Sequence, residues 1–123
     1  MLVAVAAQGE RMDSHVDPKF GRCPYFVVVD PETMKGESLP NPGAGASGGA
    51  GMSTAQALVK AGVSAVIAGN IGPNAITALS SAGIGAYIVS GGTVADAVDA
   101  YKAGTLARVE RATVPQHAGV GRG

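Results

Sequence analysis

Three short glycine-rich segments stand directly before stretches that we expect to form helices. They are Gly48-Gly49-Ala50-Gly51, Gly69-Asn70-Ile71-Gly72-Pro73 and Gly91-Gly92-Thr93. The first turn of a helix has unpaired N–H groups and a partial positive charge, and glycine lets a ligand approach the backbone closely. The chemistry that these segments offer is therefore the binding of an anion by main-chain amides.

Few side chains could add metal chemistry to such a site. Cys23 is the only cysteine of the chain; it follows Arg22, and His15 lies in the same polar stretch, residues 8–24. One cysteine excludes an intramolecular disulfide and any zinc or iron–sulfur site held by several thiolates of this chain. Cys23 and His15 remain candidate metal ligands, although a lone cysteine is more often a small core residue and a loop histidine is usually solvated.

The candidate cofactor-binding residues combine the predicted helix starts with their polar neighbours. They are His15, Arg22, Cys23, Ser47, Gly48, Gly49, Asn70, Gly72, Asn74, Gly91, Gly92 and Thr93. The structural alternative stays open for each of them, because glycine often serves a turn alone and asparagine often caps a helix. A functional reading depends on all of these segments meeting at one place in the fold.

The elements that must position these residues follow from the apolar pattern. It predicts strands over residues 2–7, 25–30, 37–39, 64–68 and 86–89, and helices over 52–61, 74–82 and 93–103. Gly62, Gly83 and Gly104 are suited to end the three helices. The order β-β-β-α-β-α-β-α predicts an α/β fold with a mixed five-stranded sheet, in which the opening strands pair antiparallel and the later ones parallel.

Strand direction then brings the candidate segments together. If the first strand runs upward, the loops 8–24, 40–51, 69–74 and 90–93 all lie at the upper edge of the sheet. Ligands of open α/β sheets bind outside the carboxyl ends of the parallel strands. This edge is therefore the predicted site.

Composition limits the class of protein. A chain of 123 residues suits one domain, which we place at residues 1–112, with a flexible tail over 113–123. Nine basic residues balance nine acidic ones, so charge gives no reason to expect nucleic acid or a membrane as partner. The sequence contains no apolar run of membrane-spanning length and no basic signal-like start, so we expect a cytoplasmic protein.

An ordered set of motifs runs along the chain. It consists of Ser14–Val16, Phe20-Gly21-Arg22-Cys23-Pro24-Tyr25-Phe26, Asn41-Pro42, Ala46-Ser47-Gly48-Gly49-Ala50-Gly51, Ala68-Gly69-Asn70-Ile71-Gly72-Pro73-Asn74-Ala75, Ala82-Gly83-Ile84, and Gly92-Thr93-Val94 leading into Ala97–Tyr101. From residue 1 to about 107, the chain thereby resembles the dinitrogenase iron–molybdenum cofactor family, which includes NifX, NafY-type carriers, the C-terminal part of NifB and small stand-alone members such as the orange protein. Lys19 stands where the family typically has histidine.

The resemblance implies a ribonuclease H-like fold and the binding of a metal–sulfur cluster. The cluster would be iron–molybdenum cofactor or a related species such as molybdenum–copper sulfide, bound non-covalently or by weak coordination. A cluster that brings its own sulfides is a polyanion and needs N–H donors and a cation more than thiolates. The expected function is thus non-catalytic carriage of the cluster, as a monomer or weak dimer, between proteins that donate and accept it.

Two other classes of function remain as alternatives. A small regulatory module could bind a partner protein and no cluster, since the expected neutral surface, rich in alanine and glycine, permits this. A hydrolase of phosphate compounds is the third possibility. Two-metal nucleases need clustered carboxylates at strand ends, which the first strand and residues 61–95 lack.

Overall fold

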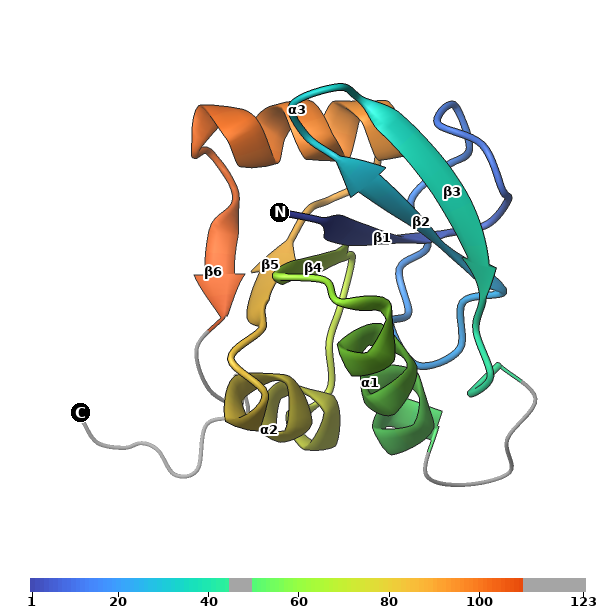
Figure 1. Cartoon of the computed structure of the whole chain (residues 1–123), viewed down its shortest axis with the longest axis vertical. Coiled ribbons are helices and arrows are strands. Elements are labelled where there is room, and N and C mark those ends of the chain that lie inside the picture. Colours follow the sequence, from blue (N-terminus) through green and yellow to red (C-terminus); the bar gives the residue numbers. More distant parts are fainter. Residues whose placement is uncertain (45–49, 110–123) are drawn as a thin grey trace.

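The computed structural model describes residues 1–44 and 50–109, which form one mixed sheet with helices on both faces (Figure 1). The strands are β1 (Val3–Ala7), β2 (Tyr25–Asp30), β3 (Lys35–Pro40), β4 (Ala65–Ala68), β5 (Gly85–Ile88) and β6 (Ala107–Val109). The helices are α1 (Ala50–Ala61), α2 (Pro73–Ser81) and α3 (Val94–Ala103). The predicted α/β class is confirmed, and the likeness to ribonuclease H stays a prediction.

The sheet has the strand order β3-β2-β1-β4-β5-β6. β1, β4 and β5 run parallel, because a helix crosses between successive strands, whereas β2 and β3 form an antiparallel hairpin beside β1. Val3 stands opposite Val29 of β2 on one side and Ala65 of β4 on the other. The pairing directions predicted for these five strands are therefore confirmed.

The strand count of five was wrong, because the sheet of the described residues has six strands. β6 follows soon after Gly104 and pairs antiparallel with β5, with Arg108 opposite Tyr87. A strand of three residues with two exposed side chains has too little apolar alternation to be recognised in the sequence.

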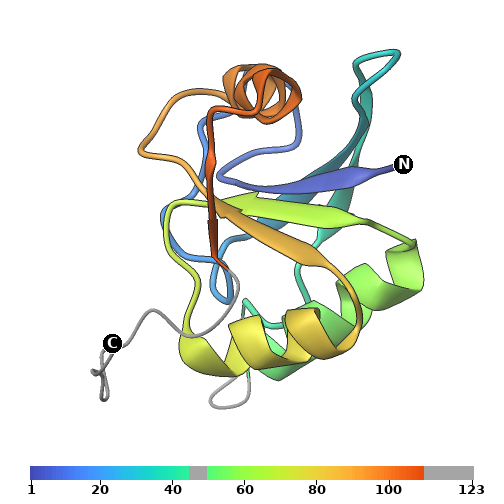
Figure 2. The same cartoon turned by 90° about the vertical axis from the view of Figure 1, so that its left-hand side faces the viewer.

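The helices form two layers, with α3 on one face of the sheet and α1 and α2 on the other (Figure 1, Figure 2). β1 carries no polar side chain because both of its faces are covered. Val3, Val5 and Ala7 belong to the core beneath α3, whereas Ala4 and Ala6 belong to the core beneath α1 and α2. Alternate residues of one strand thus build two separate hydrophobic cores.

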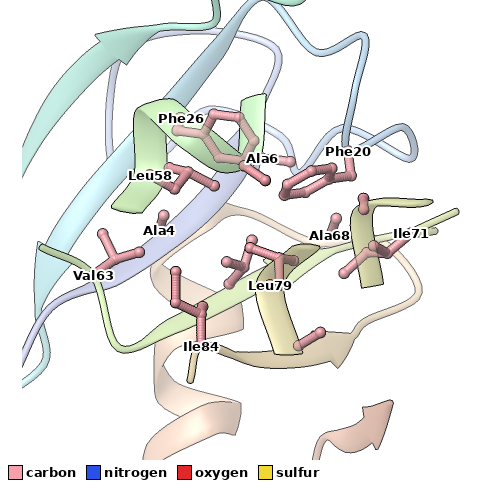
Figure 3. Packing of buried hydrophobic residues seen from close by; sticks show 14 of the residues in the cluster. Ala4, Ala6, Phe20, Phe26, Leu58, Val63, Ala68, Ile71, Leu79 and Ile84 are labelled. Atoms are coloured by element: carbon pink, nitrogen blue, oxygen red, sulfur yellow. The ribbon is translucent and has the colours of Figure 1, made fainter. Parts of the chain in front are cut away.

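The core on the α1 and α2 side contains the two phenylalanines of the chain (Figure 3). Phe26 comes from β2, whereas Phe20 comes from the connection between β1 and β2 and packs edge-on against Phe26 with ring centroids 5.4 Å apart. Leu58 of α1 and Leu79 of α2 are fully buried in the same cluster. A loop residue therefore shares the core with strands and helices.

Two further predictions concern the flexible C-terminal tail and the lack of a membrane-spanning segment. The expected tail, residues 113–123, lies outside the described residues. None of the helices in residues 1–44 and 50–109 has the length and apolar character needed to cross a membrane.

Candidate functional site

The predicted convergence of loops at one sheet edge is confirmed. β1, β4 and β5 run parallel and end where β2 begins and β3 ends, because Tyr25 pairs with both Ala7 and Pro40. Segments 8–24, 41–44, 69–72 and 89–93 meet there, and we call them the loop edge. In Figure 2, the loops after β4 and β5 lie on the same side as the blue 8–24 segment.

The 8–24 segment runs through the middle of the loop edge and connects its other loops. Val16 forms a bridge with Ala7 at the end of β1, and its amide donates to the carbonyl of Gly92 at 2.9 Å. Further along, the amide of Phe20 donates to the carbonyl of Asn70 at 3.2 Å. The 8–24 segment thus fills part of the sheet edge that the sequence predicts to be open to a ligand.

At the start of α3, the backbone amides of the first turn are bonded by the 8–24 segment and by a side-chain cap. The amides of Val94 and Ala95 each donate at 2.9 Å to carbonyls of the 8–24 segment, and the amide of Asp96 donates to Thr93 Oγ1 at 3.1 Å. Asp96 Oδ2 in turn accepts from the amide of Thr93 at 3.1 Å, which completes a capping box. The prediction of open amides does not hold for α3, because its first-turn amides are already bonded.

The residues predicted at the start of α3 thus have structural roles. Gly91 and Gly92 have φ values of +94° and +91°, a region that other residues adopt at a cost. Thr93 caps the helix with its hydroxyl group. His15 is exposed beside them, and its backbone forms a bridge with Thr93.

Thr93→Ala should therefore lower stability without changing ligand binding at the loop edge. Loss of an N-cap hydroxyl costs about 1 kcal/mol, measurable as a lower midpoint in urea. The Thr93 amide lowers the pKa of Asp96 below its ordinary range. A depressed carboxyl pKa stabilises the fold above the unfolded value of about 3.9. Thr93→Ala keeps this amide, so the contribution is tested by Asp96→Asn, whose loss of stability relative to wild type should be present at pH 7 and disappear as the pH falls through the folded pKa of Asp96. An equal difference at pH 7 and at pH 2 would contradict this role.

The start of α2 is arranged differently from that of α3. Gly72 is the N-cap, with φ −74° and ψ 166°, and no side chain caps the helix. Pro73 occupies the first turn, where its missing N–H is no loss. Within residues 1–44 and 50–109, no group accepts from the amides of Asn74 and Ala75. These amides are donors that a ligand could use.

The space in front of α2 is also open. A Cβ atom built on Gly72 meets nothing within 4 Å, and the φ of Gly72 is one that any residue adopts. Gly69, in contrast, is required by packing, because a Cβ there would lie 2.7 Å from Pro18 Cα. Neither the fold nor the backbone thus explains why residue 72 is glycine. Asn70 and Asn74 are exposed on either side of it, and neither caps α2 with its side chain.

Cys23 does not reach the surface of the loop edge. Its side chain is fully buried, and Sγ donates to the carbonyl of Phe20 at 3.3 Å. Burial, with a smaller contribution from the charge of Asp17, raises the pKa of this thiol to about 12. Since the thiolate is the form that binds metals, Cys23 is a poor ligand in this conformation. Arg22, one position earlier, is exposed.

The two candidate metal ligands therefore lie in different environments, His15 at the surface and Cys23 in the core. Within the described part of the chain, no three His, Cys, Asp or Glu side chains are placed to hold a metal ion. Ser47, Gly48 and Gly49 lie outside the described residues. Among the described residues, the loop edge therefore offers backbone donors and exposed basic side chains such as Arg22 and Lys19, rather than a preformed set of metal ligands.

The burial of Cys23 predicts slow thiol chemistry. In the native protein at pH 8, labelling of Cys23 by a disulfide reagent should be at least about 100-fold slower than in 6 M guanidinium chloride, because only the thiolate reacts and the site is closed. Cys23→Ala should still bind the ligand of the loop edge. Rapid native labelling, or loss of binding in a folded Cys23→Ala variant, would contradict the assignment of Cys23 to the core.

One feature of the site was missed in the sequence. Asn41 and Thr54 are buried polar residues that connect three segments, yet they were not among the candidates. In the sequence, Asn41 stands out only as part of a motif with Pro42. An asparagine at the end of a strand has no pattern that separates a buried hub from a surface turn, so only the tertiary contacts identify it.

The described surface contains two hollows, among others, and the second is lined in part by Asn74 at the start of α2. One of about 540 Å³ lies beside the β2–β3 hairpin, over Leu2, Val28 and Leu39. Another lies between α1 and α2, where Met52 and Val59 are about half exposed.

Comparisons with known proteins agree with this arrangement. The family profile described as "Dinitrogenase iron-molybdenum cofactor" matches residues 1–104. The apo form of the orange protein from Desulfovibrio gigas is 37% identical, with a TM-score of 0.87 over 92% of this chain and 96% of that chain. A putative NifB protein from Thermotoga is 36% identical, with a TM-score of 0.78 over 92% and 97%.

A curated relative from Methanocaldococcus jannaschii, described as uncharacterised, is 28% identical over 113 residues, which cover 89% of this chain and 92% of the relative. These similarities extend over nearly the whole chain, as does the family profile. The chain belongs to the dinitrogenase iron–molybdenum cofactor family.

Proposed function

We propose that this protein binds and carries an anionic metal–sulfur cluster at the loop edge, without catalysing a reaction. The observation that carries the proposal is the start of α2. The amides of Asn74 and Ala75 have no acceptor among the described residues, and a Cβ on Gly72 would extend into open space. A helix N-terminus that glycine keeps accessible is suited to an anion with several acceptor atoms.

The cluster is cargo and not a resident cofactor in this proposal. A cluster complete with its own sulfides, such as iron–molybdenum cofactor or molybdenum–copper sulfide, can be held by N–H donors and a cation. The family and the similarity to the apo orange protein support this class of cargo. The lack of a three-residue metal-ligand group in the described residues agrees with loose, reversible binding, which suits transfer between a donor protein and an acceptor protein.

The proposed contacts follow from the geometry of the loop edge. Gly72 and the α2 amides face the anion, with Asn70 and Asn74 beside them as side-chain donors. Arg22 supplies positive charge, and His15 a ligand that can exchange. Residues 47–49 belong to the proposal on their sequence alone. Cys23 is left out of direct contact because it is buried.

Anaerobic reconstitution tests the proposal. The full chain is mixed with tetrathiomolybdate and Cu(I), or with isolated iron–molybdenum cofactor, and separated from free cluster by gel filtration. We expect a coloured complex with a fixed ratio of metal to protein, and no complex with the protein unfolded in guanidinium chloride. If the folded protein binds none of these species, the proposal fails.

A further inference from the structure

A buried polar cluster lies directly beneath the loop edge. Asn41 and Thr54 are the two buried polar side chains among the described residues, with exposed fractions of 6% and 0%. Burying a polar group is unfavourable unless its hydrogen bonds are satisfied, so a cluster of this kind calls for a specific arrangement of partners. The hydrogen bonds of the Asn41 and Thr54 side chains are satisfied, and they fix the positions of the neighbouring backbone segments.

The side chain of Asn41 is bonded at both ends. Its Oδ1 accepts from the hydroxyl of Thr54 at 2.7 Å and from the amide of Gly43 at 2.9 Å. Its Nδ2 donates to the carbonyl oxygens of Cys23 at 2.8 Å and Gly21 at 3.2 Å. Nδ2 also donates to Cys23 Sγ at 3.6 Å. Two donors face the oxygen, whereas two carbonyls and this sulfur face the nitrogen, so a carboxamide in this orientation satisfies every partner.

The two carbonyls belong to the residues on either side of Arg22. The backbone before Arg22 and the backbone after it are both held by one NH₂ group, which is fixed through Oδ1 by Thr54 of α1. The amide of Asn41 also donates to the carbonyl of Pro24 at 3.0 Å, which fixes the same loop a second time. Arg22 itself is exposed at the loop edge.

We infer that Asn41 is a positioning residue that holds the backbone around Arg22, so that its guanidinium group meets the anionic cargo of the loop edge, and that Thr54 orients Asn41 for this task. The inference rests on the proposed function and deepens it. Charge-assisted bonds from arginine depend on direction, so a loop that is free to shift lowers the share of conformations in which Arg22 can bind. Asn41 acts through Arg22 and does not touch the cargo.

The test is a double-mutant cycle with tetrathiomolybdate and Cu(I) as the probe, under anaerobic conditions. Arg22→Gln should weaken binding about tenfold, the size of one charge-assisted hydrogen bond. Asn41→Leu keeps the branching at Cγ and removes the hydrogen-bonding groups, and should weaken binding about five- to tenfold. The double variant should bind no more than about twofold weaker than Arg22→Gln alone, because both changes remove the same interaction.

A milder pair of variants covers the case in which Asn41→Leu does not fold. Thr54→Val keeps the shape of the side chain and removes the hydroxyl group, and should weaken binding about threefold. Thr54→Ser restores the hydroxyl and should recover most of this loss. Thr105→Val is the matched control, since it removes a hydroxyl bonded to the carbonyl of Ala100 at the opposite end of α3 from the loop edge.

Salt dependence separates positioning from a general structural effect. Removal of Arg22 should reduce the slope of log Kd against log salt concentration, and Asn41→Leu or Thr54→Val should reduce it in the same way. If wild type binds and Arg22→Gln weakens binding, but the Asn41 and Thr54 variants fold and bind like wild type, the inference fails and the proposed function survives. Additive losses in the double variant also overturn the inference. If wild type does not bind the probe or iron–molybdenum cofactor, the proposed function fails and the inference fails with it.

Discussion

Gly72→Asp should weaken cluster binding at least about 100-fold while leaving the protein as stable as wild type or slightly more stable. The two effects have opposite signs because they arise from the same helix start. Aspartate is a better N-cap than glycine and interacts favourably with the helix dipole, together about 0.5 kcal/mol. The backbone at Gly72, with φ −74°, accepts a side chain without strain, and a Cβ there meets no atom within 4 Å.

Binding falls for two physical reasons in this variant. The carboxylate at position 72 bonds the amides of Asn74 or Ala75, which are the donors proposed for the cluster. It also places a negative charge where a polyanion would bind. A loss of about 2.7 kcal/mol corresponds to the 100-fold change. The measurements are the Kd for tetrathiomolybdate with Cu(I) and the urea midpoint of the same preparation.

Two further glycine variants serve as controls. Gly72→Ser improves the cap without adding charge, so its stability should lie between those of wild type and Gly72→Asp, while binding falls about tenfold or less. Gly83 lies just after α2 with φ +78°, so Gly83→Ala should cost about 1 kcal/mol and leave binding unchanged. If Gly72→Asp binds the cluster like wild type, the start of α2 is not the binding surface.

These glycines also show which parts of the structure could be predicted from the sequence. Gly62, Gly83 and Gly104 were expected to end the three helices, and all three have φ values between +73° and +78°. A helix stop depends on the local backbone, so one residue and its neighbours suffice to predict it. β1 was predictable for a similar reason, since a continuous apolar run is buried on both faces of the sheet.

The interior of the loop edge could not be predicted in this way. The sequence could place the 8–24 segment at the right edge, but it carries no periodicity that shows where its carbonyls point. Those carbonyls bond the first amides of α3, and so one of the three helix starts that look alike in the sequence is closed. The burial of Cys23 and the bonds of Asn41 also arise from contacts between segments far apart in the chain.

Phe20→Ala should cause the largest loss of stability among the variants of the loop edge, about 3–5 kcal/mol. Phe20 lies in a polar loop segment, yet its ring is 2% exposed and packs against Phe26 in the core beneath α1 and α2 (Figure 3). Removing the ring leaves a cavity that a loop and two helices cannot fill. Thermal and urea unfolding measure the loss, which is a large part of the 5–15 kcal/mol typical of a whole domain.

Phe26→Ala separates the role of Phe20 in the core from its role in the loop edge. Phe26 belongs to the same ring pair but lies in β2, where strand pairing to β1 and β3 holds its backbone. Phe20 is held instead by its ring and by the bond from its amide to the carbonyl of Asn70. Both variants should lose similar stability. At 10 °C, where enough of each protein remains folded, the affinity for the cluster per folded molecule should fall about ten times more in Phe20→Ala than in Phe26→Ala. Equal losses would mean that the ring of Phe20 supports the core alone, and that the backbone bonds of the 8–24 segment suffice to hold the loop edge together.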